Sequence, residues 1–381
     1  MATVWLIHNN IPPYRVPLFA EVAKTTDFDF CVVLTAAKSK HRPHWKTKAE
    51  FMPFKVLTMK GLNFRWSEDA SVSISLSLFP SLILRRPDVV ICSGFSLSTF
   101  SVFLYTRLLR KKYIIWSEAT EVTERWRRVS RLRKQFRRLL VAGADAFVDA
   151  GTLSREYLQT LIPMGRRAPF FRSYNCVERS AFSSDMKCTP KANKTNRETS
   201  RKILFVGQLI VRKGIPMLLE VYKKLVRMSS VSLELVLIGE GPLEQYIRGF
   251  KRENNLARIY LEGQVSYVEV ARYYKTFDVF VLLSRADCNP LVIFEALHAG
   301  IPIVCSENAG NAPDFIVPGK NGYIVNPEDK DSIVQCLSDV LKWDTAKRAE
   351  CARVSREQVT KANYKDSAAA FIEAFKAVFR E

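Results

Sequence analysis

The sequence contains few of the residues that build metal sites, and it lacks the composition of a fibrous or disordered chain. Its four histidines, His8, His41, His44 and His298, form no cluster with metal-ligand spacing, so we expect no metal site. The 15 Gly and 17 Pro among 381 residues exclude collagen-like and low-complexity classes. Because 48% of the residues are apolar, a largely disordered chain is also excluded.

Paired cysteines are absent as well. No two of the eight cysteines form a CxxC pair, and most lie in apolar runs. This pattern predicts reduced and mostly buried thiols in a cytosolic setting rather than a disulfide framework or a zinc site. The cysteines are Cys31, Cys92, Cys176, Cys188, Cys288, Cys305, Cys336 and Cys351.

Long uninterrupted hydrophobic runs are lacking too. The N-terminus, MATVWLIHNN, has neither a basic region nor a small-residue cleavage site, so we do not expect a signal peptide. Val89–Thr106 is uncharged but interrupted by serines, and Ala70–Leu84 is short and contains Pro80. A membrane span needs about 20 mainly apolar residues, so we expect a buried strand running into a buried helix instead.

Positive charge is abundant. The chain carries 58 Lys and Arg against 38 Asp and Glu, for a formal net charge of +20. Such an excess predicts an anionic partner, either the phosphates of a small ligand, an anionic membrane or a nucleic acid. No recognisable nucleic-acid reading module accompanies the charge, so we expect no nucleic-acid partner.

Short apolar runs alternate with longer amphipathic stretches along both halves of the chain. This alternation predicts parallel sheets built from βαβ units, and hence an α/β chain of two doubly wound, Rossmann-like domains. The segment Ser71–Leu78 alternates at period two as a strand does, with a helix as the competing interpretation. The expected strands are Val4–His8, Cys31–Leu34, Val89–Cys92, Tyr113–Trp116, Ala146–Val148, Ile203–Val206, Leu233–Ile238, Ile259–Leu261, Val279–Leu283 and Ile303–Cys305.

A polar stretch, Ser183–Arg201, contains no apolar run and has the composition of a linker. We therefore expect an N-terminal domain over residues 1–182 and a C-terminal domain over residues 202–362. An apolar-faced helix is expected at Ser367–Phe379.

The window Ser284–Gly300, SRADCNPLVIFEALHAG, is the most informative part of the sequence. Asn289 is a good helix N-cap, Pro290 suits the first helical position and Gly300 suits the end. The free N–H groups near Leu291 and Val292 would form an anion site suited to a diphosphate. Asp287 and Glu295 beside it would hold hydroxyls of a sugar or ribose, although an acid near a helix start is common.

Two further windows carry possible phosphate contacts. In FVGQLIVRKG a strand ends at Gly207, and Arg212 and Lys213 precede a helix start, where the helix dipole disfavours cations. A phosphate would explain the two cations, and a solvated pair is the alternative. In LVLIGEGP, Gly239 would let a ligand approach the backbone, or would simply form a turn.

Taken together, FVGQLIVRKG, LVLIGEGP, LEGQVSYVEVARYYKTFDVFVLLSR, ADCNPLVIFEALHAGIPIV and NGYIV resemble the retaining glycosyltransferases of family 4. IPPYRVPLF, Asn175 and the C-terminal helix fit the same family. The resemblance implies the GT-B architecture, with two Rossmann-like domains facing a cleft. It also implies that the last helix, over residues 363–381, returns to the first domain.

The resemblance assigns roles in the second domain. Arg212 and Lys213 would bind the diphosphate and stabilise the departing nucleotide, which is often the largest catalytic effect. Asp287 would contact the donor sugar and Glu295 the ribose hydroxyls. The other expected donor contacts are Leu291, Val292, Gly207, Gly239 and the base pocket around Gly263–Val265, including Val265.

The chain departs from the family pattern at several positions. Asp287 replaces the first glutamate of the E-x7-E motif, and Gln208 replaces an arginine. Where many members have a histidine near the donor sugar, this chain has Trp116-Ser117-Glu118, and we assign the polar role to Glu118. His8 ends the first strand and is a further site candidate, and Asn10, Tyr14 and Arg15 follow on the expected acceptor side.

The run Arg125–Arg138, RWRRVSRLRKQFRR, contains no acidic residue. Its apolar residues recur every three or four positions, which predicts a basic amphipathic helix over residues 125–140. Such a helix fits an anionic membrane surface, or it packs its apolar face on its own domain. The loop Lys38–Lys48 adds charge. The expected membrane contacts are Arg125, Trp126, Arg128, Arg131 and Phe136.

We therefore expect a metal-independent, retaining glycosyltransferase at the cytosolic face of a membrane. Its co-substrate would be a UDP- or GDP-linked sugar, with no other cofactor, and its acceptor a lipid-linked glycan. The DxD sequence Asp27-Phe28-Asp29 is interpreted as a solvated strand edge rather than a metal site. The alternatives are another GT-B enzyme, such as a sugar-nucleotide epimerase, and a non-catalytic membrane-surface protein with the same fold.

Overall fold

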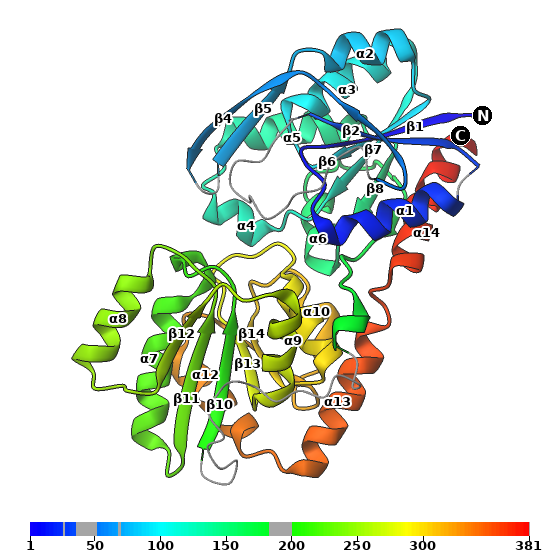
Figure 1. Cartoon of the computed structure of the whole chain (residues 1–381). Helices are drawn as coiled ribbons and strands as arrows, with labels where there is room; N and C mark the ends of the chain where they lie inside the picture. Colours follow the sequence, from blue (N-terminus) through cyan, green and yellow to red (C-terminus); the bar gives the residue numbers. More distant parts are fainter. Residues whose placement is uncertain (26, 36–51, 68–69, 183–199, 381) are drawn as a thin grey trace. The chain divides into compact units, whose positions relative to one another are not determined.

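A computed structural model of the chain describes residues 1–25, 27–35, 52–67, 70–182 and 200–380 (Figure 1). The chain divides into two compact units. Unit 1 contains Met1–Cys176 and Ala362–Glu381, and unit 2 contains Val177–Lys361. Each unit is an α/β domain around its own parallel sheet, as the alternating apolar runs predict.

Unit 1 is built on a seven-stranded sheet in the order β3-β2-β1-β6-β7-β8-β9, with every neighbouring pair parallel. Its inner strands are almost completely buried, which explains their continuous runs of Val, Ile and Phe. The strands are β1 Thr3–His8, β2 Asp29–Leu34, β3 Lys55–Thr58, β6 Val89–Ser93, β7 Lys112–Ser117, β8 Ala146–Asp149 and β9 Phe170–Arg172.

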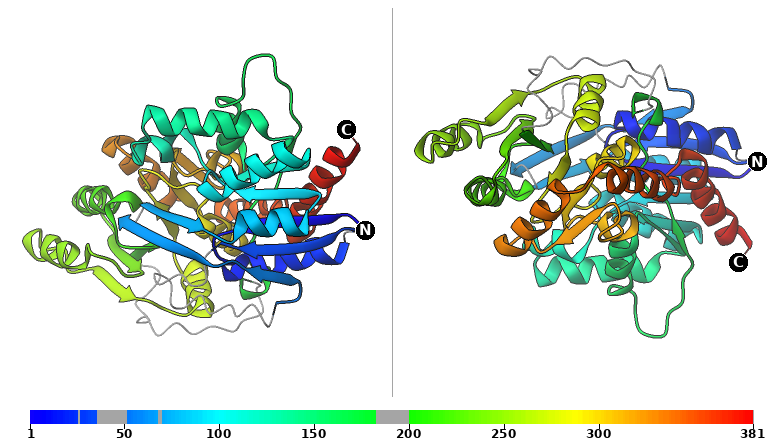
Figure 2. Two further views of the ribbon diagram at one scale, coloured as in Figure 1. Left: turned by 90° about the horizontal axis from the view of Figure 1, so that it is seen from above. Right: turned by 90° about the horizontal axis from the view of Figure 1, so that it is seen from below.

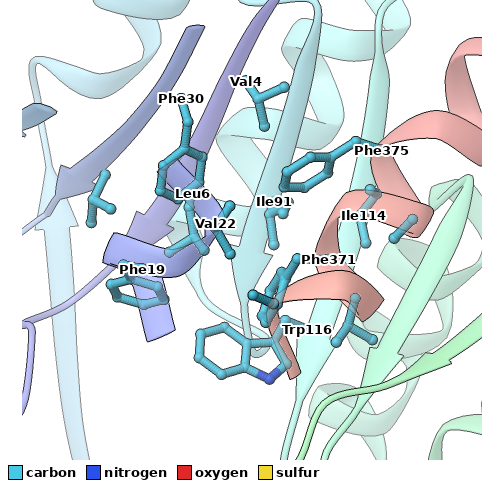
Figure 3. Close-up of a cluster of buried hydrophobic side chains, with 14 of the residues drawn as sticks. Val4, Leu6, Phe19, Val22, Phe30, Ile91, Ile114, Trp116, Phe371 and Phe375 are labelled. Carbon is cyan, nitrogen blue, oxygen red and sulfur yellow. The ribbon is translucent and has the colours of Figure 1, made fainter. Parts of the chain in front are cut away.

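Helices cover both faces of this sheet. On one face, α1 (Val16–Thr25) and α14 (Tyr364–Arg380) bury an aromatic core in which Trp116 meets Phe371 edge to face at 5.1 Å (Figure 3). The residues of the last helix thus complete the core of unit 1. The other face carries α2 (Leu78–Arg85), α3 (Leu97–Leu109), α5 (Arg131–Gly143) and α6 (Thr152–Gln159). The remaining elements of unit 1 are η1 Pro13–Arg15, the hairpin β4 Gly61–Ser67 and β5 Ala70–Ser75, and α4 Glu121–Trp126.

The structure gives the secondary structure of two segments for which the sequence left alternatives open. Ser71–Leu78 is a strand as far as Ser75, where β5 ends, and Leu78 then begins α2. Val89–Thr106 is the buried strand β6 followed by α3, as expected. Within the described residues, no helix combines the length and the hydropathy that crossing a bilayer requires.

Unit 2 is built on a six-stranded parallel sheet in the order β12-β11-β10-β13-β14-β15. Its strands are β10 Ser200–Val206, β11 Ser232–Ile238, β12 Ile259–Gly263, β13 Val279–Leu282, β14 Ile303–Ser306 and β15 Gly322–Val325. Its helices are η3 Arg179–Phe182, η4 Val211–Lys213, α7 Ile215–Met228, α8 Glu244–Glu253, α9 Tyr267–Thr276, α10 Leu291–Ala299, α11 Ala312–Phe315, α12 Lys330–Leu341 and α13 Thr345–Val359.

The unit boundaries differ from the expected ones. Val177–Phe182 belongs to unit 2, although the sequence placed it in the N-terminal domain, because the Phe182 ring packs against Tyr267 and Tyr274 of α9. Ser200 and Arg201, expected in the linker, are the first residues of β10. The rest of that linker, 183–199, lies outside the described residues.

Candidate functional site

Three glycines line the carboxyl edge of the sheet in unit 2. Gly207 follows β10, Gly239 follows β11, and Gly263 ends β12. The Gly207 N–H donates to the Ile238 carbonyl at 2.9 Å, and the Gly239 N–H donates to the Gly263 carbonyl at 2.8 Å. A Cβ at Gly239 would lie 2.0 Å from the Gly207 oxygen, so the two strand ends meet closely only because this side chain is absent.

The sheet order reverses between β10 and β13, which is the place where open α/β sheets bind ligands. The turn η4, with Arg212 and Lys213, follows β10, and Asp287 follows β13. Gly214, with φ of 78°, lets the η4 turn approach β13, because a Cβ there would lie 1.9 Å from the Leu283 oxygen. The topology therefore brings these residues to one edge from positions 74 apart in the sequence.

The two cations of η4 have different partners. The Lys213 ammonium forms an ion pair with the Asp287 carboxylate, and the two side chains are only 13% and 12% exposed. The Arg212 guanidinium donates to the Ala286 carbonyl at 2.9 Å. Backbone bonds fix Asp287 in turn, since its N–H donates to Asn308 and its carbonyl accepts from Gly310. Both predicted phosphate cations thus lie beside the loop that leads into α10.

The helix α10 begins at Leu291, one residue later than predicted. Pro290, not Asn289, occupies the N-cap position, because Pro290 keeps an extended backbone with φ of −67° and ψ of 116°. Leu291 and Val292 are therefore the first helical residues. Because no helical turn precedes them, their N–H groups have no carbonyl acceptor within the helix. Gly300 ends the helix in the left-handed conformation, with φ of 74°, as expected.

Glu295 lies on α10 and is buried, with 8% of its surface exposed. The Tyr274 hydroxyl donates a hydrogen bond to its Oε2 atom at 3.1 Å. Burial raises the pKa of Glu295 to about 7, and the bond from Tyr274 opposes part of that rise. Tyr274 was not identified from the sequence as a site residue. Val265, expected at the base pocket, is half-buried between the end of β12 and Ser266, the N-cap of α9.

A second polar cluster lies in unit 1, where β1 and β7 end. The Arg15 guanidinium forms an ion pair with Glu118 and contacts the Nε2 atom of His8. The Asn175 side-chain amide donates to the same Glu118 oxygen at 3.0 Å. Burial and the neighbouring Arg15 charge hold the pKa of His8 well below its usual value, so His8 is neutral near pH 7.

The Arg15 side chain is almost completely buried in unit 1. It is 6% exposed, and its guanidinium stacks over Trp116 with its central carbon 4.2 Å from the ring centroid. Asn10 and Tyr14 are half-buried nearby, and the Asn10 N–H donates to the Nδ1 atom of His8 at 3.3 Å. Glu118 thus neutralises the charge of Arg15 within unit 1. The assignment of Asn10, Tyr14 and Arg15 to the acceptor side stays a prediction.

The basic segment is not one helix over residues 125–140. The helix α4 ends at Trp126, Arg128 adopts a positive φ of 49°, and Ser130 caps a new helix at Arg131. Phe136 faces inward and packs on Phe100, with ring centroids 5.7 Å apart. Arg125, Arg128 and Arg131 are exposed, Trp126 is half-buried, and the loop 38–48 lies outside the described residues.

The described residues contain no group of three or more His, Cys, Asp or Glu side chains that could hold a metal ion. In the DxD sequence, Asp29 begins β2 and forms an ion pair with Lys55 at 2.5 Å. The Asp29 side chain is 39% exposed, as the interpretation of a solvated strand edge predicts.

Residues 189–358 match the model of the family described as glycosyl transferases group 1. An uncharacterized glycosyltransferase of Methanocaldococcus jannaschii is 29% identical over 140 residues, which cover 36% of this chain and 38% of that protein. The sulfoquinovosyl transferase SQD2 of Arabidopsis thaliana is 28% identical over 166 residues, covering 43% of this chain and 31% of that protein. The chain thus spans about a third of the length of these curated relatives.

Solved structures resemble the chain over its whole length. Sucrose-phosphate synthase from Thermosynechococcus elongatus superposes with a TM-score of 0.73 at 16% identity, covering 100% of both chains. Anabaena HepE in complex with UDP and glucose superposes with a TM-score of 0.72 at 14% identity, covering 99% of this chain and 100% of that one. The expected α/β fold with two Rossmann-like domains is confirmed, and so is the resemblance at the level of group 1. Family 4 itself stays a prediction.

Proposed function

We propose that this chain is a retaining glycosyltransferase, because residues 189–358 match the glycosyl transferases group 1 model. It would move a sugar from a nucleotide-diphosphate sugar to a membrane-associated, lipid-linked glycan. The observation that carries the proposal is the position of the η4 cations beside Asp287 and the start of α10, at the reversal of the sheet order in unit 2.

The donor would bind along this edge. Its diphosphate accepts hydrogen bonds from the first N–H groups of α10, and Arg212 and Lys213 neutralise its charge. The Glu295 carboxylate accepts hydrogen bonds from the ribose hydroxyls, and the base lies near Val265. The UDP and UDP-glucose complexes of HepE, a structural relative, support a nucleotide-diphosphate donor.

The reaction would break the bond between the anomeric carbon and the diphosphate oxygen, and the acceptor hydroxyl oxygen would form a new bond to that carbon on the face that the diphosphate leaves. The hydroxyl proton would pass to the departing diphosphate oxygen. Negative charge develops on the departing diphosphate, and Lys213 and Arg212 stabilise it without a metal. Asp287 then has two roles. It holds Lys213 in place before the donor binds, and it accepts a hydrogen bond from a donor hydroxyl afterwards.

Unit 1 would bind the acceptor. Its polar cluster presents Glu118, a carboxylate held between Arg15 and Asn175, at the carboxyl end of β7. A carboxylate anchored in this way is suited to hold a sugar hydroxyl of the acceptor, and the neutral His8 adds a second polar group.

An apolar face with basic residues supports membrane contact by unit 1. The helices α2, α3 and α5 contain no Asp or Glu, and Figure 2 shows them side by side. The exposed leucines of these helices, together with Leu76 just before α2, form a surface that we call the leucine face. Its members are Leu76, Leu84, Leu97, Leu104, Leu108, Leu132 and Leu139. Exposed arginines at 85, 110, 131 and 133 accompany it. Exposed leucines together with exposed arginines on the same helices fit the interface of an anionic bilayer, at about 1 kcal/mol for each cation near the surface.

The proposal is tested by thermal unfolding of the wild type and of Lys213→Ala with UDP, GDP, ADP and CMP, each free and sugar-linked. One nucleotide should stabilise the wild type by about 2.7 kcal/mol at 100 times its dissociation constant, and the variant much less. If no nucleotide shifts the wild type at millimolar concentration, the donor site is refuted. Binding without turnover on any lipid-linked glycan would favour a non-catalytic protein with this fold.

A further inference from the structure

Tyr274 links two parts of the candidate donor site. It lies on α9 and is 1% exposed, and its hydroxyl is the group that bonds Glu295 at 3.1 Å. The same hydroxyl lies 3.3 Å from the Val292 carbonyl in the first turn of α10. One phenol therefore contacts both the expected ribose ligand and the turn whose N–H groups face the expected diphosphate.

Aromatic rings hold Tyr274 in this position. Phe280 of β13 meets its ring at 5.4 Å, and Phe182 of η3 meets it at 6.0 Å, both edge to face. Phe182 also contacts Tyr267 at 5.4 Å and stacks on His298 of α10 at 6.3 Å. The phenol is thus fixed between the sheet, α10 and the segment η3 by which the chain enters unit 2.

We propose that Tyr274 is a positioning residue for the donor nucleotide: it holds the Glu295 carboxylate toward the ribose, and the ring of Phe182 holds Tyr274. This inference rests on the proposed function, because it assumes that Glu295 binds the ribose. Neither residue touches the reacting atoms. Both act through the orientation and the charge of Glu295.

Tyr274 also acts on the charge of Glu295. A carboxylate binds two ribose hydroxyls only when it is ionised, and burial already raises the Glu295 pKa to about 7. The phenol donates to the ionised form, so its removal raises the pKa further. Within the described residues, other titratable groups near α10 include Tyr267 on α9, Glu178 and Arg179 at the start of η3, His298 on α10 itself, Cys305 on β14 and Cys351 on α13.

The pKa values of His298, Cys305 and Cys351 lie outside the range from pH 5.5 to 8.5. Burial lowers the pKa of His298 to about 4, and it raises the pKa values of Cys305 and Cys351 to about 12 and about 11. The terminal phosphate of UDP or GDP itself titrates near pH ~6. The part of the pH dependence that is lost in Glu295→Gln, measured with the same nucleotide, therefore reports Glu295.

The test is calorimetric binding of UDP and GDP, and of their 2′-deoxy forms, between pH 5.5 and 8.5. The wild type should bind more tightly as the pH rises through about 7. Tyr274→Phe should move this midpoint upward and weaken binding about tenfold at pH 7, with a smaller loss at pH 8.5. Removing the ribose 2′-hydroxyl should weaken binding less in Tyr274→Phe than in the wild type, since both changes affect one contact.

Tyr222→Phe is the matched control. Tyr222 is also a buried tyrosine of unit 2, and its hydroxyl bonds the Leu233 carbonyl at 2.8 Å without contacting Glu295. Tyr222→Phe should therefore leave the pH midpoint of nucleotide binding unchanged. Phe182→Leu, which keeps the Tyr274 hydroxyl but removes the ring beside it, should move the midpoint upward by less than Tyr274→Phe does.

The inference is overturned if Tyr274→Phe binds with the wild-type affinity and pH profile, or if its loss is equal at every pH and shared by Tyr222→Phe. If Phe182→Leu keeps the wild-type pH midpoint, the proposal that the Phe182 ring holds Tyr274 in position is overturned. Failure of the proposed function looks different, because the wild type itself would then bind none of the nucleotides at any pH.

Discussion

The ammonium group of Lys213 and the carboxylate of Asp287 form an ion pair at the carboxyl edge of the unit 2 sheet, with little of either side chain exposed. Each charge therefore has a partner in this structure. In the proposed function, a diphosphate bound here would draw Lys213 from Asp287 or share it, which would free the carboxylate for a sugar hydroxyl. The pair would thus couple recognition of the phosphate to recognition of the sugar.

Breaking this pair should destabilise the protein as well as abolish turnover. Lys213→Met leaves the Asp287 charge almost buried without its partner, which costs roughly 3 kcal/mol. In the double variant with Asp287→Leu most of the stability should return, while turnover stays lost. Urea unfolding together with a sugar-transfer assay measures both effects.

Lys224→Met is the control for this experiment, because Lys224 pairs with Asp331 at the surface, where the two side chains are 38% and 78% exposed. Its effect should stay below about 1 kcal/mol. Equal effects of Lys213→Met and Lys224→Met would contradict a special role of the buried pair.

Gly214 should tolerate no side chain. Gly214→Ala places a Cβ 1.9 Å from the Leu283 oxygen, so the η4 turn must move away from β13 and carry Arg212 and Lys213 with it. We expect a loss of more than about 2 kcal/mol in the free energy of unfolding and a loss of nucleotide binding. Gly165→Ala isolates the backbone effect, since Gly165 has nearly the same φ, 79°, and open space around it. It should cost only about 1 kcal/mol and keep nucleotide binding.

Two groups on α10 should give unit 2 opposite responses to pH. The pKa of Glu295 is raised in the folded state from 4.5 to about 7, so its contribution to stability is lost as the pH rises through that interval. The pKa of His298 is lowered from 6.5 to about 4, so its contribution is lost as the pH falls through that interval.

The two contributions can be separated by variants. As the pH rises from 4.5 to 7, the free energy of unfolding of Glu295→Gln should increase by up to about 3 kcal/mol relative to that of the wild type. His298→Gln should gain up to about 3 kcal/mol relative to the wild type as the pH falls from 6.5 to 4. Urea titrations at several pH values measure these differences. Differences that stay constant with pH would show that neither group shifts.

The leucine face predicts selective binding to anionic vesicles. Leu84 and Leu132 are 82% and 80% exposed, and replacing both with Gln should weaken vesicle binding more than tenfold without lowering the melting temperature. Met228→Gln is the control, since Met228 is 64% exposed but lies at the end of α7 in unit 2. Cosedimentation with vesicles containing phosphatidylglycerol, against vesicles of phosphatidylcholine alone, is the measurement. Equal binding to both vesicle types, or by all variants, contradicts the assignment.

The strands could be predicted because parallel strands are buried on both faces and therefore appear as short continuous apolar runs. The start of α7 and the end of α10 could be predicted for a related reason. Gly214 and Gly300 both adopt a positive φ that glycine favours, so their positions in the sequence mark these turns.

Other features could not be predicted from one sequence. The break between α4 and α5 depends on Arg128, a residue with no preference for the left-handed conformation that it adopts. The pairing of Arg15 with Glu118 joins positions 103 apart, which only the folded sheet brings together. The window YVEVARYYKT contains Tyr274, but its neighbour Tyr273 bonds Glu262 at a more exposed site, and only the phase of α9 distinguishes the two.

The position of α14 in the core of unit 1 has a consequence for how the chain is made. Ribosomes release residues 177–361, all of unit 2, before the helix that supplies Phe371 and Phe375 to the first sheet. The synthesis of unit 1 therefore begins first and ends last. Until α14 is made, the sheet of unit 1 lacks the Phe371 ring that packs on Trp116. The nascent chain therefore carries a domain with exposed apolar surface throughout the synthesis of unit 2, the domain proposed to bind the donor.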